Sequence, residues 1–180
     1  SGAQADMGFS LPASIGAAAS IEPSFSRVHA LTGDGSFQLN IQEIQTLVTK
    51  RLPVTLYVLN NNGYLSIRAT QSSFFPGRQC GTDPKSGVEF PNIELLCAAY
   101  RIEYRYAADV ETLRSIIAES RECSYPIICE VLCPHDEAII PRTKTIKNPD
   151  GSLESAPLCN MQPSLHDDIK AKLNSLGFEC

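Results

Sequence analysis

The sequence predicts an α/β protein: a three-layer arrangement with a central parallel sheet flanked by helices. Apolar segments of strand length, at 28–32, 53–59, 102–106 and 126–133, alternate with segments whose apolar residues recur at helical spacing. Strand, helix and strand with short joins imply parallel strands and a right-handed crossover. The carboxyl ends of such strands meet at one edge of the sheet, where open α/β folds bind ligands.

The first elements lead to two turns at the ends of neighbouring strands. A slim, alanine-rich helix is expected around residues 13–19, followed by a surface connection. The first strand, 28–32, runs into Gly33-Asp34-Gly35-Ser36, and the second, 53–59, runs into Asn60-Asn61-Asn62-Gly63. The helix between these strands places its apolar residues on one face; these are Ile41, Ile44, Leu47 and Val48. Both turns are therefore expected at the same edge.

Local signals place the remaining elements. Asn40 with Glu43 is a candidate capping box for the helix between the first two strands. Residues 64–75 predict a weak helix, with Ile67, Phe74 and Phe75 as its apolar anchors. The loop at 76–89 is longer than an ordinary connection, so it is either a lid or a solvated surface excursion. Its Arg78 is a candidate contact for an anionic substrate.

The second half of the sequence continues the alternation of helices and strands and then becomes polar and rich in turn residues. Asn92 opens a helix, the strand 102–106 follows, and the amphipathic helix 110–120 leads to the last strand. We expect one domain over residues 1–140 and a C-terminal tail over residues 141–180. The tail carries a strong turn signal at Asn148-Pro149-Asp150-Gly151 and a short helix within 164–176. It either drapes over an active site, packs on a neighbouring subunit or forms a mobile appendage.

The chemistry of the two turns favours a hard divalent cation. Asp34 offers a carboxylate, Asn61 a side-chain carbonyl and Gly63 a main-chain carbonyl. Three oxygen donors, without sulfur or imidazole, suit magnesium or calcium. Three protein ligands leave three of the six coordination positions of an octahedral magnesium ion open, and phosphate oxygens and water usually fill such positions. Gly35, Ser36 and the amides that open the following helix are candidates for cradling those phosphates.

Two motifs in this region resemble the thiamine-diphosphate signature. They are Gly33-Asp34-Gly35 and, about two dozen residues later, Asn60-Asn61. The upstream run Ala5–Ala17 is similar to the segment that precedes the signature in acetolactate synthase-like enzymes. The resemblance covers most of residues 2–135 and implies the thiamine-diphosphate-binding fold of these enzymes, here their C-terminal diphosphate-binding domain.

The resemblance also implies roles for individual residues. Asp34, Asn61 and the Gly63 carbonyl would hold Mg²⁺, which bridges the diphosphate. Met7 would prop the cofactor in its bent conformation, and the Ala5 carbonyl would accept a hydrogen bond from the aminopyrimidine. The amide of Tyr64 is a further candidate contact to the diphosphate. The full cofactor-binding set is Ala5, Met7, Gly33, Asp34, Gly35, Ser36, Asn61, Gly63 and Tyr64.

In enzymes of this kind the activating glutamate lies on a pyrimidine-binding domain, usually of the partner subunit. This sequence lacks that domain and the middle domain, and the strand expected before Gly2 is also missing. We therefore interpret the chain as the diphosphate-binding portion of a larger or split enzyme, working as a homodimer or tetramer. A 2-oxo acid is the expected substrate, with an acetolactate synthase-like carboligase and a decarboxylase both open. No catalytic residue is nominated, and His29, His135 and His166 are expected to be structural or solvent-facing.

Three other classes of protein compete with this hypothesis. A Rossmann dinucleotide site needs a glycine where Gln38 stands and an acidic residue where Asn60-Asn61 stands. A P-loop needs a Gly-Lys-Ser/Thr run, which the sequence does not contain. A non-catalytic module that keeps the fold and metal site for assembly only remains open.

Composition narrows the setting. The net charge is −5 with scattered basic residues, so nucleic acid is an unexpected partner. No apolar run is long enough to span a bilayer, and the start of the sequence lacks a signal-like pattern. We therefore expect a cytoplasmic protein that does not associate with a membrane. The seven cysteines include no Cys-x-x-Cys pair. Cys129, Cys133 and His135 form the only grouping in the sequence that could suggest a metal site. Because Cys129 and Cys133 lie in an apolar strand, we expect packing residues in a reducing compartment.

Overall fold

The computed structural model describes residues 6–21, 27–137, 140–143, 145–157 and 160–178. The chain divides into two units, residues 1–136 and residues 137–180. The first unit carries the predicted parallel sheet and most of the buried side chains.

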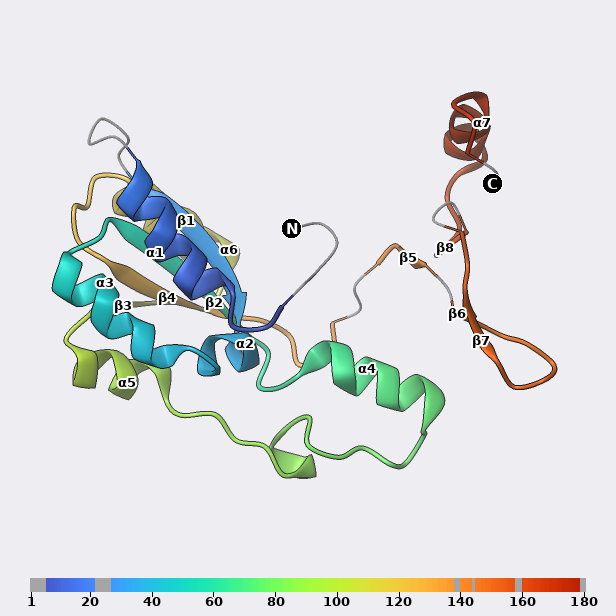
Figure 1. Ribbon diagram of the computed structural model, residues 1–180, viewed down its shortest axis with the longest axis horizontal. Coiled ribbons are helices and arrows are strands. Elements are labelled where there is room, and N and C mark those ends of the chain that lie inside the picture. Colours follow the sequence, from blue (N-terminus) through green and yellow to red (C-terminus); the bar gives the residue numbers. More distant parts are fainter. Residues whose placement is uncertain (1–5, 22–26, 138–139, 144, 158–159, 179–180) are drawn as a thin grey trace. The chain divides into compact units, whose positions relative to one another are not determined.

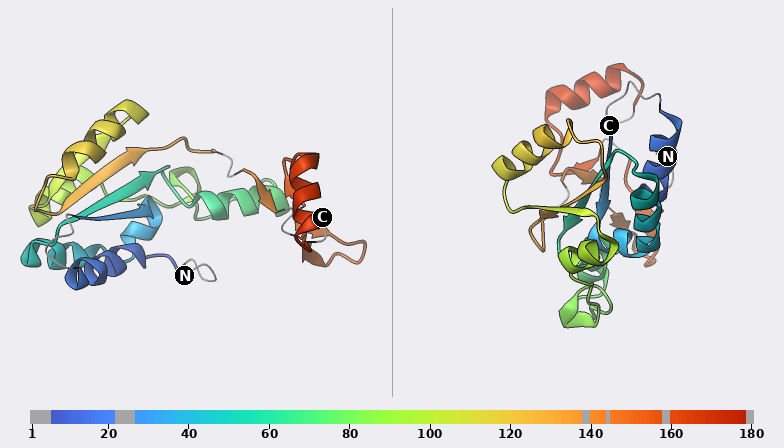
Figure 2. Two further views of the ribbon diagram at one scale, coloured as in Figure 1. Left: turned by 90° about the horizontal axis from the view of Figure 1, so that it is seen from above. Right: turned by 90° about the vertical axis from the view of Figure 1, so that its left-hand side faces the viewer.

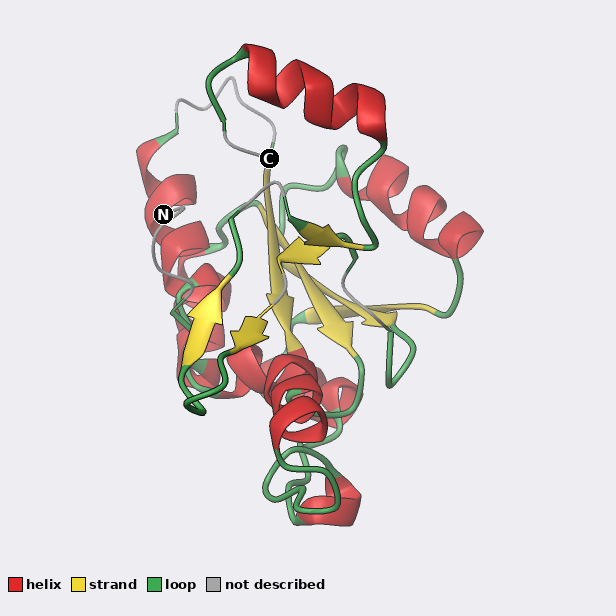
Figure 3. Cartoon of the chain, turned by 90° about the vertical axis from the view of Figure 1, so that its right-hand side faces the viewer, coloured by secondary structure: helices red, strands yellow, loops and turns green. Residues whose placement is uncertain are grey.

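The first unit is built on a four-stranded sheet in the order β1-β2-β4-β3. Its strands are β1 (Val28–Gly33), β2 (Val54–Asn60), β3 (Glu103–Ala107) and β4 (Ile127–Leu132). All three pairings are parallel, and the register joins Gly33 to Leu59 and Asn60 to Leu132. Strands β1 and β2 are therefore neighbours that end at the same edge, and Figure 3 shows helices on both sides of the strands.

Helices cover the two faces of this sheet unequally. The helical segments of the unit are α1 (Ser10–Ser20), α2 (Asp34–Gln38), α3 (Ile44–Lys50), α4 (Leu65–Phe74), α5 (Ile93–Tyr100) and α6 (Val110–Ser120), with short 3₁₀ turns at Ile41–Glu43 and Pro84–Ser86. Helices α1, α2, α3 and α5 supply residues to the core on one face, and α6 packs on the other (Figures 1 and 2). The predicted three-layer α/β architecture is confirmed.

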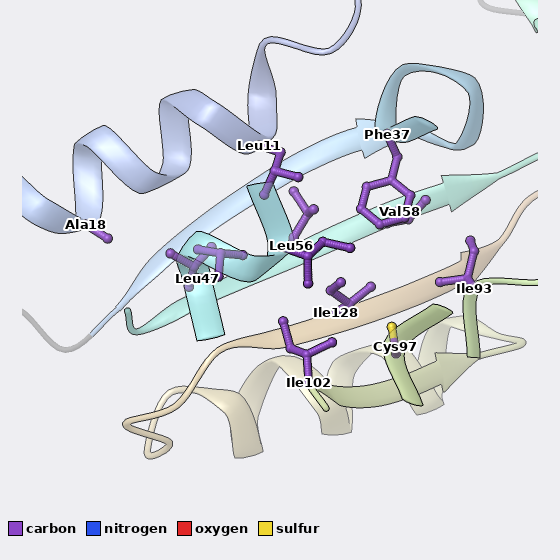
Figure 4. Packing of buried hydrophobic residues seen from close by; sticks show 12 residues of the cluster. Leu11, Ala18, Phe37, Leu47, Leu56, Val58, Ile93, Cys97, Ile102 and Ile128 are labelled. Carbon is purple, nitrogen blue, oxygen red and sulfur yellow. The ribbon is translucent and has the colours of Figure 1, made fainter. Parts of the chain in front are cut away.

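The main core lies between the sheet and the helices α1, α2, α3 and α5. Leu56, Val58 and Ile128 point from the strands toward Leu11 and Phe37 of the helices (Figure 4). Leu56, Val58 and Ile128 are fully shielded from solvent. A smaller cluster on the opposite face consists of Tyr57, Ala107, Ile116 and Cys129. Because alternate strand residues face opposite sides and both faces are covered, every residue of β2 from Val54 to Val58 is buried.

Three local expectations were wrong. The Asn40 side chain makes no capping hydrogen bond; its Nδ2 donates instead to the Gly8 carbonyl, 2.9 Å away. A short helix, α2, also begins at Asp34, where the sequence predicted only a turn. In α4 the expected anchors Ile67, Phe74 and Phe75 are 43%, 36% and 55% exposed, and the one buried residue is Arg68. A polar network described below, rather than apolar packing, holds this helix.

The second unit contains two small antiparallel pairs and one helix. Strand β5 (Arg142–Thr143) pairs with β8 (Met161–Gln162), and β6 (Thr145–Lys147) pairs with β7 (Leu153–Ser155). The predicted turn at 148–151 closes the β6–β7 hairpin, with the Gly151 N–H donating to the Asn148 carbonyl at 2.9 Å. Helix α7 (Asp167–Ser175) lies within the expected segment. Among the described residues of this unit only Ala156 is buried.

Candidate functional site

The acidic turn after β1 and the asparagine turn after β2 lie side by side. The Asp34 carboxylate accepts the Gly35 N–H at 2.8 Å through Oδ1 and the Gly63 N–H at 2.9 Å through Oδ2. The second of these bonds joins residues 29 positions apart and ties the two turns directly. This geometry follows from the parallel β1–β2 pairing, since adjacent strands in the same direction end together.

Asp34 is a buried carboxylate surrounded by backbone amides. It is 5% exposed, and burial raises its pKa above the ordinary value, while the amides of Gly63 and Gly35 act in the opposite direction. The ion pairs within the described part of the chain involve other side chains. A buried carboxylate in this setting gains from a cation placed beside it.

Asn61 contributes an unsatisfied oxygen at the same place. Its Oδ1 is the buried side-chain polar atom without a hydrogen-bond partner within the described residues. Buried polar atoms are almost always paired, so an unpaired one points to a ligand, an ion or a water molecule. The Gly63 carbonyl accepts the Leu65 N–H at 3.2 Å, which leaves a second lone pair available. The residues present therefore fit a hard divalent cation in their donor chemistry.

The predicted phosphate contacts lie next to this position. Gly33 ends β1, and Gly35 and Ser36 lie in the first turn of α2. The Ser36 hydroxyl accepts the Gly8 N–H at 2.8 Å, which holds the Met7-Gly8 turn against α2. Met7 is 49% exposed in that turn, and Ala5 lies outside the described residues.

Tyr64 contacts the site through its ring rather than through its amide. Its N–H donates to the Thr82 carbonyl at 2.8 Å, so this amide is engaged within the protein. A Cβ added to Gly35 would collide with the Tyr64 ring, which packs edge-on against Phe90 with centroids 5.3 Å apart. Only glycine leaves room for the ring here, and the predicted contact between the Tyr64 amide and a diphosphate needs the Thr82 bond to open.

Sequence reasoning missed a buried arginine behind the asparagine turn. Arg68 is 3% exposed; its Nε contacts Asp136 Oδ1 at 3.2 Å, and its Nη1 donates to the Thr82 carbonyl at 3.3 Å. Its Nη2 donates to the His135 carbonyl, and His135 in turn contacts Asp83 at 3.4 Å. This network joins α4, the 76–89 loop and the segment after β4. A single arginine within a weakly apolar helix is the only sequence signal that marked it.

The 76–89 loop is therefore partly packed rather than wholly a lid or an excursion. Thr82 and Asp83 are buried, and Asp83 with Ser86 forms a capping box around the 3₁₀ turn. Arg78 is exposed, and its role as an anion contact stays a prediction.

Among the described residues, the other histidine, cysteine and acidic side chains do not form a second metal site. In the described part of the chain no three His, Cys, Asp or Glu side chains form a group able to hold a metal ion. Cys97 and Cys129 are buried, and burial raises the pKa of their thiols to about 12 and about 11. His29 lies against Tyr57, His135 lies between Asp83 and Asp136, and His166 is exposed beside Asp168. No helix in the described ranges is long and apolar enough to cross a membrane.

The fold and the paired turns define a class of protein. A parallel α/β domain with a carboxylate, a free amide oxygen and main-chain carbonyls at its carboxyl edge is a ligand-binding domain suited to a cation and a phosphorylated cofactor. A family model described as "Thiamine pyrophosphate enzyme, C-terminal TPP binding domain" matches residues 1–131. The chain belongs to this family of thiamine-diphosphate-dependent enzymes, as its C-terminal cofactor-binding domain.

Individual relatives agree with the family. The chain is 34% identical over 145 residues to a chloroplastic acetolactate synthase of Arabidopsis thaliana, covering 78% of this chain and 21% of that protein. An acetolactate synthase 3 of Brassica napus is 34% identical over 139 residues, with 75% and 21% covered. The chain thus spans about a fifth of the length of these curated relatives.

Solved structures show the same fold. A thiamine diphosphate-dependent 4-hydroxybenzoylformate decarboxylase from Rhodococcus jostii RHA1 superimposes with a TM-score of 0.64 at 26% identity, covering 73% of this chain and 24% of that one. A benzoylformate decarboxylase from Polynucleobacter necessarius gives the same TM-score of 0.64 at 24% identity, which supports the fold alone.

Proposed function

We propose that this chain supplies the diphosphate- and magnesium-binding part of the active site of an enzyme that acts on 2-oxo acids. Asp34, Asn61 and the Gly63 carbonyl hold Mg²⁺, and the Mg²⁺ binds the diphosphate of the cofactor. Gly33, Gly35 and Ser36 line the diphosphate, and Met7 with the Ala5 carbonyl contacts the rest of the cofactor.

The observation that carries this proposal is the unpaired Asn61 Oδ1 beside the buried Asp34 carboxylate. Both groups are shielded from water, and they come from turns that the Gly63–Asp34 hydrogen bond joins. An apolar or purely structural turn would have no reason to keep an amide oxygen unsatisfied, because that state costs about 1–3 kcal/mol. A divalent cation removes the cost and neutralises the carboxylate at once.

The chemistry itself belongs to the cofactor. Bound thiamine diphosphate supplies the carbanion chemistry that breaks and forms carbon–carbon bonds next to a carbonyl. The residues of this chain hold the diphosphate end, and the Ser36–Gly8 hydrogen bond fixes the Met7 turn relative to α2. Their contribution is binding and orientation.

The proposal includes a partner. A pyrimidine-binding domain, of the same protein or of a second subunit, provides the activating glutamate, and the assembly is a homodimer or tetramer. The acetolactate synthase and decarboxylase relatives support a carboligase or a lyase acting on a 2-oxo acid, with acetolactate synthase-like chemistry favoured by the curated relatives.

Calorimetric titration with thiamine diphosphate at fixed MgCl₂ tests the proposal, on the full chain alone and with a pyrimidine-binding domain. We expect binding that requires Mg²⁺, and we expect Asp34→Ala to abolish it while the circular-dichroism spectrum stays unchanged. Asp109→Ala is the matched control, since Asp109 is also an aspartate at the sheet's carboxyl edge but only caps α6. Unchanged affinity in Asp34→Ala would refute the ligand assignment, and cofactor binding without turnover in the complete assembly would identify a non-catalytic module.

A further inference from the structure

One acidic side chain interrupts the apolar strand β4 at its carboxyl half. Glu130 is half-buried, and its two oxygens are used separately: Oε1 accepts Asn60 Nδ2 at 2.6 Å, and Oε2 accepts the Tyr104 hydroxyl at 2.6 Å. In the sheet register Glu130 pairs with Val58, so Asn60 lies two positions further along the neighbouring strand, on the same face. The carboxylate thus links β3, β4 and β2.

The link continues from Asn60 into the asparagine turn. Asn60 Oδ1 accepts the Asn62 N–H at 2.9 Å, which spans Asn61. On the far side of the turn, the Gly63 N–H donates to Asp34 at 2.9 Å. Asn61 therefore sits in a backbone segment that is tied at both ends, by Asn60 before it and by Asp34 after it.

The direction of these bonds depends on Glu130. An asparagine amide has a donor end and an acceptor end, and rotation by 180° exchanges them. A carboxylate accepts only, so Glu130 requires the Nδ2 end of Asn60 to face it and leaves Oδ1 for the Asn62 N–H. Without the carboxylate, Asn60 loses the partner that selects this orientation.

We propose that Glu130 is a positioning residue for the cation ligand Asn61, and that it acts through the Asn60 side chain. This inference rests on the proposed function and goes beyond it, since Glu130 is neither a proposed cation ligand nor a proposed cofactor contact; its hydrogen bonds go to Asn60 and Tyr104. Groups that orient metal ligands typically contribute about 10- to 100-fold to metal affinity.

The two arms of Glu130 supply a matched pair of variants. Glu130→Leu removes both hydrogen bonds, whereas Tyr104→Phe removes only the bond from Tyr104 and keeps the bond from Asn60. We expect Glu130→Leu to weaken Mg²⁺-dependent thiamine diphosphate binding by about 10- to 100-fold, measured by calorimetry on the full chain. Tyr104→Phe is expected to keep the wild-type affinity even where it lowers the melting temperature.

Glu130→Gln provides the conservative rescue. Its Oε1 can accept from Asn60, and its Nε2 can donate to the Tyr104 oxygen, so binding should stay near the wild-type level. In an Asn60→Ala background, Glu130→Leu should cause no further loss, because the pathway through Asn60 is already broken.

A second readout needs no cofactor. Hydrogen exchange of the Asn62 amide, followed by NMR, should accelerate in Glu130→Leu and not in Tyr104→Phe, since only the first releases Asn60. If the wild type fails to bind thiamine diphosphate with Mg²⁺, the proposed function fails and this inference with it. If the wild type binds and Glu130→Leu binds equally well, or if both variants lose affinity in step with stability, only the positioning role is overturned.

Discussion

At the scale of residues, the candidate site consists of two side chains from the turns that follow β1 and β2. Asp34 accepts hydrogen bonds from its own turn and from the asparagine turn, so it fixes the geometry of both turns. Asn61 keeps its Oδ1 unpaired beside it. A structural role explains the hydrogen bonds of Asp34, whereas the unpaired oxygen of Asn61 points to a ligand, an ion or a water molecule.

Gly63 should tolerate no side chain. Its φ is +147°, and an added Cβ would collide with the Thr82 carbonyl and approach Arg68 Nη1 to 2.7 Å. We expect Gly63→Ala to lower the free energy of unfolding by about 2 kcal/mol or more, measured in urea. Gly16→Ala is the control: nothing lies within 4 Å of its added Cβ in α1, so a gain of about 0.5–1 kcal/mol is expected. Equal effects of the two variants would contradict the crowding argument.

His29 should make stability sensitive to acid. Although His29 is exposed, partial desolvation, followed by the charges of Arg27 and Arg121, lowers the pKa of His29 from its ordinary value of 6.5. The unfolded chain then binds a proton more readily than the folded protein, so stability is lost as the pH falls through about 6.5 toward the lowered value. His29→Phe keeps an aromatic ring beside Tyr57 and removes this titration.

Unfolding in urea at about pH 7.5 and about pH 5.5 provides the comparison. The wild type should lose more stability between these conditions than His29→Phe does. An identical loss in the two proteins would assign the acid sensitivity to other groups.

At the scale of elements, adjacent parallel strands bring distant residues together. The β1–β2 pairing places Gly33 opposite Leu59, so the residues that follow each strand meet without any special loop geometry. This much could be predicted from the sequence, because apolar runs that end in Gly-Asp-Gly and Asn-Asn are visible directly. Strands β3 and β4 and helix α6 likewise lie within one residue of their predicted ends, and α5 begins directly after Asn92, where the sequence places its start.

The polar supports of the turns could not be predicted in the same way. Arg68, Thr82 and His135 meet only because α4 and two loops fold back together, and no local pattern encodes those contacts. Glu130 carried a visible signal, a single acid within an apolar strand, but its partners Asn60 and Tyr104 lie on two other strands. The Asn40 capping box failed because the Asn40 Nδ2 donates to the Gly8 carbonyl, 32 residues away, and its Oδ1 accepts from Gln42 Nε2 at 3.2 Å.

Among the side chains that hold α4 and the neighbouring loops together, we expect Arg68 to contribute most to the free energy of unfolding. Arg68→Met removes a buried cation that donates to Thr82 and His135 and contacts Asp136. We expect a loss of about 2–4 kcal/mol in the free energy of unfolding, measured in urea, because the two carbonyls lose their donors. Asp136→Asn should have a much smaller effect, since Asp136 is 77% exposed and water replaces its partner. Comparable losses in the two variants would place the stabilisation in the ion pair rather than in the carbonyl contacts.

At the scale of the whole molecule, the two units differ in how much they bury. The first unit contains both apolar clusters, whereas the strands of the second unit consist almost entirely of exposed residues. The family match covers residues 1–131 and thus ends within the first unit. Cofactor binding is therefore a property proposed for the first unit, and the sequence pattern of the tail carried no comparable functional signal.

Hydrogen exchange should report this difference. Amides of the β6–β7 hairpin and α7 are expected to exchange much faster than those of β2 and β4, because a solvent-exposed two-stranded hairpin has little protection of its own. Mass spectrometry of deuterium uptake on the full chain measures both sets at once. Equal protection in the two units would mean that another surface covers the tail in solution.

The most direct test of the proposed site is anomalous diffraction from crystals grown with thiamine diphosphate and Mn²⁺, which replaces Mg²⁺ at oxygen-rich sites. We predict one strong peak bounded by the Asp34 carboxylate, Asn61 Oδ1 and the Gly63 carbonyl, with the diphosphate adjacent to it. A bound cofactor with its metal peak at any other group of residues would contradict the assignment of these two turns.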